Sequence, residues 1–199
     1  ITQHHLSDSI EDICNTVGQP VAQTEVSIRS VDDNCAVAIG EVGEICARGP
    51  CVMLEYHDNP KATSETVDAG GWLHTGDLGQ MDMRGYVTVT GRVKEMIIRG
   101  GENHFPAEIE NCLLEHTSVI EVAVVGLPDP KWGEVIGAFI RSTGPIDKAA
   151  LHAHCRANMS PQKTPNVWVQ VEGFPLTGSG KIQKFVLRDR FIAGEFNEL

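Results

Sequence analysis

Several features that would assign a chain of 199 residues to a special class are missing from this sequence. No apolar run approaches the ~18 residues that indicate a membrane span, and residues 1–6 have neither the basic flank nor the apolar core of a signal peptide. Lys and Arg form no runs, and a formal net charge of -11 would repel a phosphate backbone. The sequence therefore argues against nucleic acid as a partner and against a transmembrane segment, and it favours a cytoplasmic protein.

Patterns of a metal or redox site are also absent. The cysteines form no C-x-x-C pair, so we expect reduced, mostly buried thiols at Cys14, Cys35, Cys46, Cys51, Cys112 and Cys155. Four histidines lack partners at the spacing that zinc requires, and we expect them at the surface: His4, His5, His152 and His154. No metal site built from protein side chains is therefore expected.

The composition is that of an ordinary globular protein, with 41% hydrophobic and 22% charged residues. Its length allows one domain or two small ones. Residues 24–29 and 42–48 alternate apolar and polar side chains, as strands do. Asn59 and Pro60 are typical of the start of a short helix, which Gly70 would end. The first ninety residues are therefore expected to be mainly strand.

The pattern changes after Gly91, where helices and strands begin to alternate. Pro106 opens an amphipathic helix with Ile109, Cys112 and Leu113 on one face. Further elements are predicted as strands at 119–125, 135–140 and 167–171 and helices at 147–159 and 185–192, with Asp147 as an N-cap. The sequence thus predicts a mixed α/β chain of two domains, residues 1–92 and 93–199, with a short joint.

Four loops place glycine beside a charged or hydroxyl residue, where the backbone can approach an anion closely. They are residues 74–77, 91–94, 99–103 and 176–181. Asp77 in the first loop is either a turn cap or a carboxylate for paired ribose hydroxyls. Arg92 and Lys94 in the second are either solvated charges or a nucleotide contact and a hinge. Taken alone, these residues leave both interpretations open.

The last loop superficially resembles a phosphate-binding loop. Pro175 stands where a Walker A motif requires Gly, and Ile182 stands where it requires Ser or Thr. A P-loop ATPase is therefore excluded. What remains is a glycine-rich loop that presents Lys181, and such a lysine suits an oxyanion that develops only in a transition state.

The order and spacing of these segments resemble the late core motifs of the adenylate-forming superfamily, which includes acyl-CoA synthetases, peptide-synthetase adenylation domains and beetle luciferases. The resembling segments are residues 71–77 (a Thr-Gly-Asp motif), 91–98 with 100–110 (a hinge motif) and 175–182 (a final lysine motif). Residues 16–20 and 43–50 are similar to strands and turns of the family's β-barrel subdomain. Leu176 and Lys184 depart from the family's usual Lys and Arg, but neither change removes a group that the chemistry needs.

The resemblance implies a role for each candidate residue. These are Asp77 and Arg92 for nucleotide binding, Lys94 as the hinge, Gly100 and Gly101 for the pantetheine arm of coenzyme A, and Lys181 as the catalytic lysine. It also implies the fold, with residues 1–92 as a distorted β-barrel subdomain ending a large N-terminal domain. Residues 93–199 would be a small mobile α+β C-terminal domain.

The implied function is that of an ATP-dependent acyl-CoA synthetase, which activates a carboxylic acid, here a fatty acid, as acyl-AMP and transfers it to coenzyme A. ATP, Mg²⁺ and coenzyme A would be its cofactors, and an upstream N-terminal domain would be its partner. Because the phosphate loop and the acyl pocket would lie upstream of Ile1, the chain alone is expected to be inactive. The alternatives are a peptide-synthetase adenylation fragment and a non-catalytic interaction module.

Overall fold

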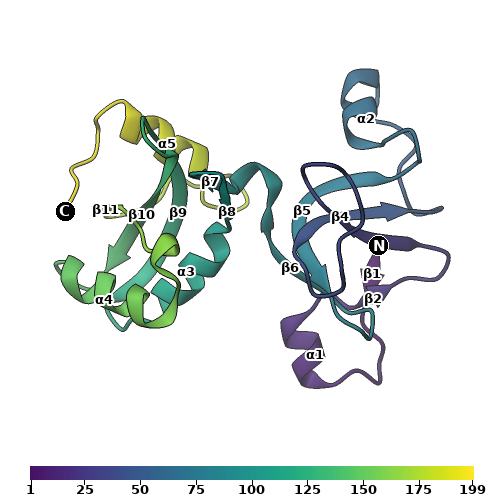
Figure 1. Cartoon of the computed structure of the whole chain (residues 1–199), viewed down its shortest axis with the longest axis horizontal. Coiled ribbons are helices and arrows are strands. Elements are labelled where there is room, and N and C mark those ends of the chain that lie inside the picture. The colour runs from purple at the N-terminus through teal and green to yellow at the C-terminus, as the bar shows by residue number, and fades with distance from the viewer. The chain divides into compact units, whose positions relative to one another are not determined.

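The computed structural model describes residues 1–199 and divides them into two compact units, Ile1–Lys94 and Glu95–Leu199. Figure 1 shows the order of the helices and strands within each unit. The predicted boundary after Arg92 lies two residues before this division. None of the helices combines the length and the apolar character that crossing a bilayer requires.

The first unit is built on an antiparallel sheet with the order β3-β4-β5-β6. Its strands are β3 (Glu25–Arg29), β4 (Gly43–Arg48), β5 (Leu73–Met81) and β6 (Val87–Arg92). A separate short ladder joins β1 (Thr2–Gln3) to β2 (Gln19–Pro20). Because β3 and β6 are edge strands, the sheet is open, and no closed barrel is present in this unit.

A small apolar core supports this sheet. Ile28, Ile45 and Val87 are buried together, with Val26, Val37 and Met81 packed against them. The alternating pattern of the sequence has this origin, since side chains that alternate along a strand point to opposite faces.

Two short helices flank the sheet of the first unit. In α2 (Pro60–Thr66), the side chain of Asn59 accepts a hydrogen bond from the backbone N–H of Ala62, at 3.0 Å, as an N-cap does. The other helix, α1 (Ile10–Asn15), has no buried residue. Its apolar residues Ile10, Ile13 and Cys14 have helical spacing, but the helix spans only six residues, and it was not predicted.

The second unit combines a five-stranded sheet with three helices. Its strands are β7 (Ile97–Arg99), β8 (Glu102–His104), β9 (Val119–Asp129), β10 (Gly133–Ser142) and β11 (Val167–Gln170). Its helices are α3 (Pro106–Leu114), α4 (Lys148–Asn158) and α5 (Lys184–Ile192). β10 pairs antiparallel with β9, parallel with β11, and at Gly133 with β7.

Helices cover both faces of the second sheet (Figure 1). One core packs Ile109, Leu113 and Leu151 from α3 and α4 against the strands, and the other packs Leu187 of α5 against the opposite face. Burial on both faces explains why the central strands are almost continuously apolar. β9 extends to Asp129, four residues beyond the predicted strand.

The thiols and histidines differ in part from what the sequence predicts. All six cysteines are free, but Cys14, Cys35 and Cys51 are exposed, so only half are buried. His154 is not a simple surface residue, because its Nε2 lies 2.8 Å from the carbonyl oxygen of Cys112 and its ring packs edge-on against His116. It therefore ties α4 to α3.

Candidate functional site

Asp77 lies at the end of a bulge in β5. On β4, Glu44 and Cys46 are two residues apart, but their partners on β5 are Leu78 and His74. Ile45 alone therefore faces the three residues 75–77, which bulge out of the ladder. Within the bulge, Thr75 Oγ1 donates to the carbonyl oxygen of Ile45 at 2.7 Å and accepts from the N–H of Asp77 at 3.1 Å.

Asp77 and Arg92 are neighbours across the sheet. They are register partners on β5 and β6, and Arg92 Nε lies 2.7 Å from Asp77 Oδ1. The Asp77 side chain is 36% exposed and that of Arg92 is 62% exposed. Such an exposed pair contributes only ~0–1 kcal/mol to stability. The structure thus brings together the two residues that are predicted to bind the nucleotide, at a place where a molecule from solvent can reach them.

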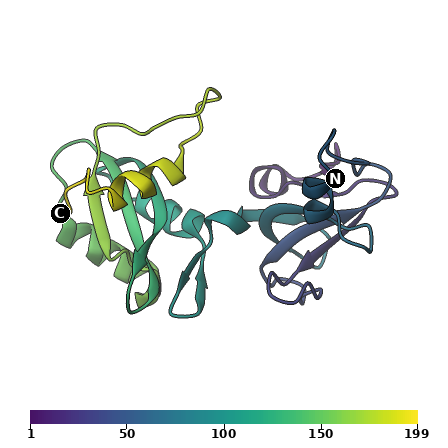
Figure 2. The ribbon, with the colours of Figure 1, turned by 90° about the horizontal axis from the view of Figure 1, so that it is seen from above.

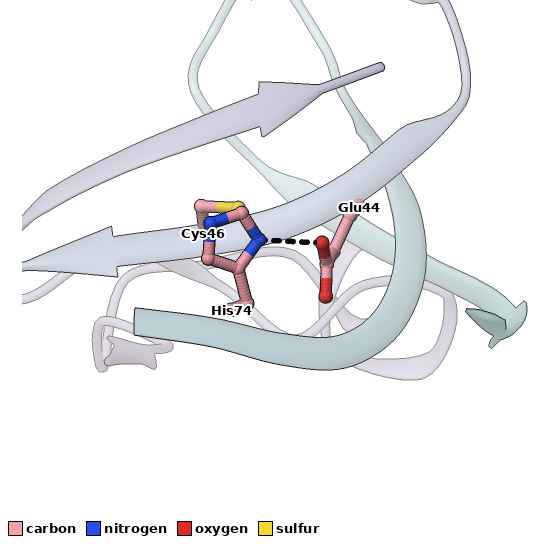
Figure 3. Close-up of side chains that lie close together, drawn as sticks. All are labelled: Glu44, Cys46 and His74. Carbon is pink, nitrogen blue, oxygen red and sulfur yellow. Dashed lines mark hydrogen bonds and ion pairs between the residues drawn. The ribbon is translucent and has the colours of Figure 1, made fainter. Parts of the chain in front are cut away.

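Behind the bulge, three side chains from β4 and β5 meet (Figure 3). His74 Nδ1 lies 2.7 Å from Glu44 Oε2 and 3.6 Å from Cys46 Sγ. The other oxygen of Glu44, Oε1, accepts the backbone N–H of Gly76 at 2.9 Å. His74 Nε2 lies 3.6 Å from Asp68 Oδ2. Sequence reasoning missed this cluster because Glu44 and His74 are thirty positions apart in the chain.

The cluster has donor types that can hold a metal ion, since one ligand atom from each of Glu44, Cys46 and His74 lies within 4.8 Å of the others. Its geometry is nevertheless that of hydrogen bonding. Ligands of tetrahedral zinc at 2.0–2.3 Å stand about 3.3 Å or more from one another, and the His74 to Glu44 distance of 2.7 Å is shorter. Burial raises the pKa of the Cys46 thiol to about 12, which disfavours the thiolate that a metal needs.

Gly100 and Gly101 form the two-residue turn between β7 and β8, where Arg99 pairs with Glu102. Their φ values are 61° and 85°, as a type I′ hairpin turn requires. A Cβ atom on Gly100 would lie 2.9 Å from the ring of Trp132, whereas one on Gly101 would meet nothing within 4 Å. Gly101 is exposed, so the turn presents a bare backbone to solvent.

Lys181 lies on a closed loop between β11 and α5. The N–H of Thr177 donates to the carbonyl oxygen of Lys181 at 2.8 Å, and the N–H of Lys181 donates to Thr177 Oγ1 at 3.0 Å. Leu176 and Ile182 form a β-bridge at the base, and Ile182 packs against the core on the α5 side. Figure 2 shows the segment projecting away from the sheet. The lysine is thus exposed on a loop with a fixed base.

Lys184, just beyond this loop, is largely buried. Its Nζ lies 2.8 Å from both Glu95 Oε2 and Glu110 Oε1. Burial by itself would lower the pKa of Lys184, but the charges and hydrogen bonds of Glu110 and Glu95 outweigh burial and raise it. Glu110 also accepts the N–H of Val124 at 2.7 Å. These contacts join the start of α5 to α3, to β9 and to the residue after Lys94.

The remaining predicted residue, Lys94, is exposed in a 3₁₀ turn, Val93–Glu95, at the end of the first unit. Asp77 and Arg92 belong to that same unit. Gly100, Gly101 and Lys181 belong to the second unit, on two separate loops. The candidates thus form one contacting pair and three separate loop positions.

Comparison with known proteins identifies the relatives of this chain. Residues 3–57 match the family model for AMP-binding enzymes, and residues 108–181 match the model for the C-terminal domain of AMP-binding enzymes. The putative acyl-CoA synthetase YngI of Bacillus subtilis is 41% identical over 96% of this chain and 35% of its own length. The human mitochondrial medium-chain acyl-CoA ligase ACSF2 is 41% identical over 94% of this chain and 31% of its own length.

Solved structures show the same relationship. ATP-bound MatB from Rhodopseudomonas palustris superposes with a TM-score of 0.83 at 31% identity, over 89% of this chain and 36% of that one. The o-succinylbenzoate CoA synthetase MenE from Bacillus subtilis, in complex with its acyl-adenylate, gives 0.81 at 34% identity, over 90% and 36%. The chain therefore belongs to the adenylate-forming, AMP-binding enzyme family. It spans about a third of the length of these relatives.

Proposed function

We propose that the chain is the C-terminal portion of an ATP-dependent acyl-CoA synthetase. The observation that carries this proposal is the exposed Lys181 on a loop with a fixed base, in the segment that ends the match to the family's C-terminal domain. The Asp77–Arg92 pair supports it, because a carboxylate beside a guanidinium suits the ribose hydroxyls and phosphate of a nucleotide.

In the first half-reaction, an oxygen of the acid's carboxylate attacks the α-phosphorus of ATP, and the bond to pyrophosphate breaks. Two anions must approach each other, so the ammonium of Lys181 would neutralise charge as it develops. One such donor is worth ~10²–10³ in rate. Asp77 and Arg92 would hold the nucleotide.

In the second half-reaction, the sulfur of coenzyme A attacks the acyl carbon, AMP leaves, and the thiol proton passes to solvent. Gly100 and Gly101 would line the passage of the pantetheine arm, because a turn without side chains leaves room for a thin chain. Lys94 would be the hinge about which a domain of residues 93–199 rotates between the two steps.

The remaining parts of the proposal concern the whole protein. Residues 1–92 would end a large nucleotide-binding domain, in which the open sheet becomes part of a distorted barrel. The cofactors would be ATP and coenzyme A, with Mg²⁺ entering on ATP. The Glu44, Cys46 and His74 cluster does not suit Mg²⁺, which prefers oxygen ligands. The acid would be a fatty acid, the partner an upstream domain, and the location the cytoplasm.

The experiment replaces Lys181 by Ala in the intact ligase and measures the two half-reactions separately. We expect ATP–pyrophosphate exchange to fall ~10²–10³-fold, because the donor acts in adenylate formation. Thioester formation from supplied acyl-AMP should stay near normal. Lys61→Ala is the control, since Lys61 is an exposed lysine on α2 paired only loosely with Glu65.

Equal losses in both half-reactions would contradict the role of Lys181. No pyrophosphate exchange with any carboxylic acid, in wild type as in the variant, would favour a non-catalytic interaction module instead. Transfer of the acyl group to a carrier protein, and not to free coenzyme A, would favour a peptide-synthetase adenylation domain.

A further inference from the structure

Besides Thr75, which bonds within the bulge, one side chain from the neighbouring strand β4 holds the bulge that presents Asp77. Glu44 Oε1 accepts the N–H of Gly76, and Glu44 Oε2 pairs with His74 on the other flank of the bulge. These two contacts, at 2.9 and 2.7 Å, hold β5 at the residues on either side of Thr75. A carboxylate that accepts two donors in this way makes stronger hydrogen bonds than a neutral group would.

We propose that Glu44 is a positioning residue for Asp77, and that it acts by fixing the bulge of β5. The proposal rests on the proposed function, because it takes Asp77 as the ligand of the ribose hydroxyls. Glu44 does not contact Asp77 directly. Its influence runs through the backbone of Gly76, which is bonded covalently to Asp77.

Burial strengthens the contacts of Glu44 relative to those of an exposed side chain. The side chain of Glu44 is 14% exposed and that of His74 is 23% exposed, whereas Asp77 is 36% exposed. Water therefore competes weakly for the two hydrogen bonds behind the bulge, while the functional face stays open. The supporting contacts are thus more shielded from water than the Asp77 side chain.

Gly76 needs such support because its backbone is unusual. Its φ value is 74°, and a Cβ atom at this position would meet nothing within 4 Å. Glycine is thus required here by conformation and not by lack of space. A glycine in open space gains no order from side-chain packing, so the hydrogen bond from its N–H to Glu44 supplies the order instead.

His74 is anchored in turn. Its Nε2 lies 3.6 Å from Asp68 Oδ2. The N–H groups of Trp72 and Gly70 donate to the other oxygen of Asp68, both at 2.9 Å, and the hydrogen bond from Trp72 holds the pKa of Asp68 below its usual range. The imidazole therefore lies between two carboxylates, and Glu44 is not free to swing away from the bulge.

The test has a structural arm and a binding arm, both in the intact ligase. Amide exchange of Gly76 and Asp77, followed by NMR, reports the bulge. AMP affinity, compared with that of 2′,3′-dideoxy-AMP, reports the contact with the ribose hydroxyls. Glu44→Ala removes the contacts with both Gly76 and His74. Glu44→Gln retains one acceptor for Gly76, and it serves as the second variant if Glu44→Ala folds poorly.

For Glu44→Ala we expect at least about tenfold faster amide exchange at Gly76. We also expect about tenfold weaker AMP binding, which corresponds to the loss of one charged hydrogen bond between Asp77 and the ribose. Dideoxy-AMP should bind as before, and Glu44→Gln should restore most of the AMP affinity. In an Asp77→Ala background, Glu44→Ala should have no further effect on AMP. Glu25→Ala is the matched control, because Glu25 pairs with Arg48 at the surface of the same sheet.

Unchanged exchange at Gly76 would overturn the inference, as would an equal loss of affinity for both nucleotides. If Asp77→Ala weakens AMP binding and Glu44→Ala does not, the inference fails and the proposed function stands. If Asp77→Ala leaves AMP binding unchanged, the assignment of Asp77 to the ribose is wrong, and the inference that depends on it falls as well.

Discussion

Gly100 and Gly101 share a left-handed backbone, but they tolerate substitution differently. The ring of Trp132 blocks a side chain at Gly100, and the N–H of Gly100 donates to the carbonyl oxygen of Trp132 at 2.8 Å. At Gly101 only the positive φ opposes a side chain, at a cost of ~1–2 kcal/mol. Gly101 is thus the position at which the proposed coenzyme A passage can be narrowed with the least structural damage.

Gly101→Leu should raise the KM for coenzyme A without altering the release of pyrophosphate, because the side chain would project into the path of the pantetheine arm. Steady-state kinetics with coenzyme A and a separate pyrophosphate assay check both statements. Gly85→Leu is the control, since Gly85 has a φ of 83° and open space but lies in the β5–β6 turn. An equal effect on pyrophosphate release would show that the passage lies elsewhere.

The cysteines should differ in reactivity as their burial does. Burial raises the pKa of both Cys46 and Cys155 to about 12, and it raises the pKa of Cys112 as well. A raised thiol pKa means that almost no reactive thiolate exists at pH 8. Brief treatment of the folded chain with iodoacetamide, followed by mass spectrometry, should modify only the exposed cysteines, which are Cys14, Cys35 and Cys51.

Modification of all six thiols is expected only after unfolding in urea. Rapid labelling of Cys46 in the folded chain would show that β4 and β5 open locally. Such opening would also weaken the case for a fixed bulge at Asp77.

At the scale of elements, the network around Lys184 connects α5 to α3 and to the end of the 3₁₀ turn. Its partners, Glu95 and Glu110, are 37% and 16% exposed. Because Pro175 accepts the N–H of Gln183, the base of the Lys181 loop lies next to this network in the chain. The network is thus a candidate for fixing the loop on its domain.

Glu110→Ala should destabilise the second unit by ~2–3 kcal/mol, because it leaves a buried lysine with one partner and removes the acceptor for Val124. Lys184→Arg should cost less than about 1 kcal/mol, since a guanidinium can pair with two carboxylates. Urea unfolding measures both. A larger loss for Lys184→Arg than for Glu110→Ala would contradict this account.

The pH dependence of the same network follows from its raised pKa. The charged form of Lys184 is favoured in the folded state. Its contribution to stability is therefore complete below the unfolded value of ~10.4 and is lost as the pH rises through the higher folded value. Lys184→Met should remove this alkaline loss of stability, which urea titrations between pH 8 and 11 would detect.

Prediction from the sequence succeeded for elements with a periodic apolar pattern or a cap. Asp147 caps α4 as expected, since its side chain accepts the N–H of Ala150 at 3.1 Å. The β7–β8 hairpin was not predicted, because three-residue strands are too short to show alternation. The length of β9 was underestimated, because pairing with β10 extends the strand beyond its apolar stretch.

At the scale of the whole molecule, the two units divide after Lys94, so a substitution at this residue can test whether it is the hinge. Lys94→Pro should slow thioester formation and spare adenylate formation, because proline fixes φ in the 3₁₀ turn and limits rotation about it. The two half-reactions, measured separately in the intact ligase, check this expectation. Lys94→Ala, which removes the charge but not the freedom of the backbone, is the control.

Unchanged thioester formation in Lys94→Pro would count against a hinge at this position. A loss of both half-reactions in Lys94→Pro but not in Lys94→Ala would mean that the substitution disturbs the ends of both units and not only their rotation.

The sequence by itself determined the family of this chain, the positions of its loop motifs and most of its elements, because these depend on residues close together in the chain. The tertiary structure alone decided which side chains meet. It paired Asp77 with Arg92, placed Glu44 and His74 behind the bulge, and buried Lys184 between two carboxylates. The physical reason is that strand register and helix packing join residues up to ninety positions apart, and local sequence patterns carry no record of those contacts.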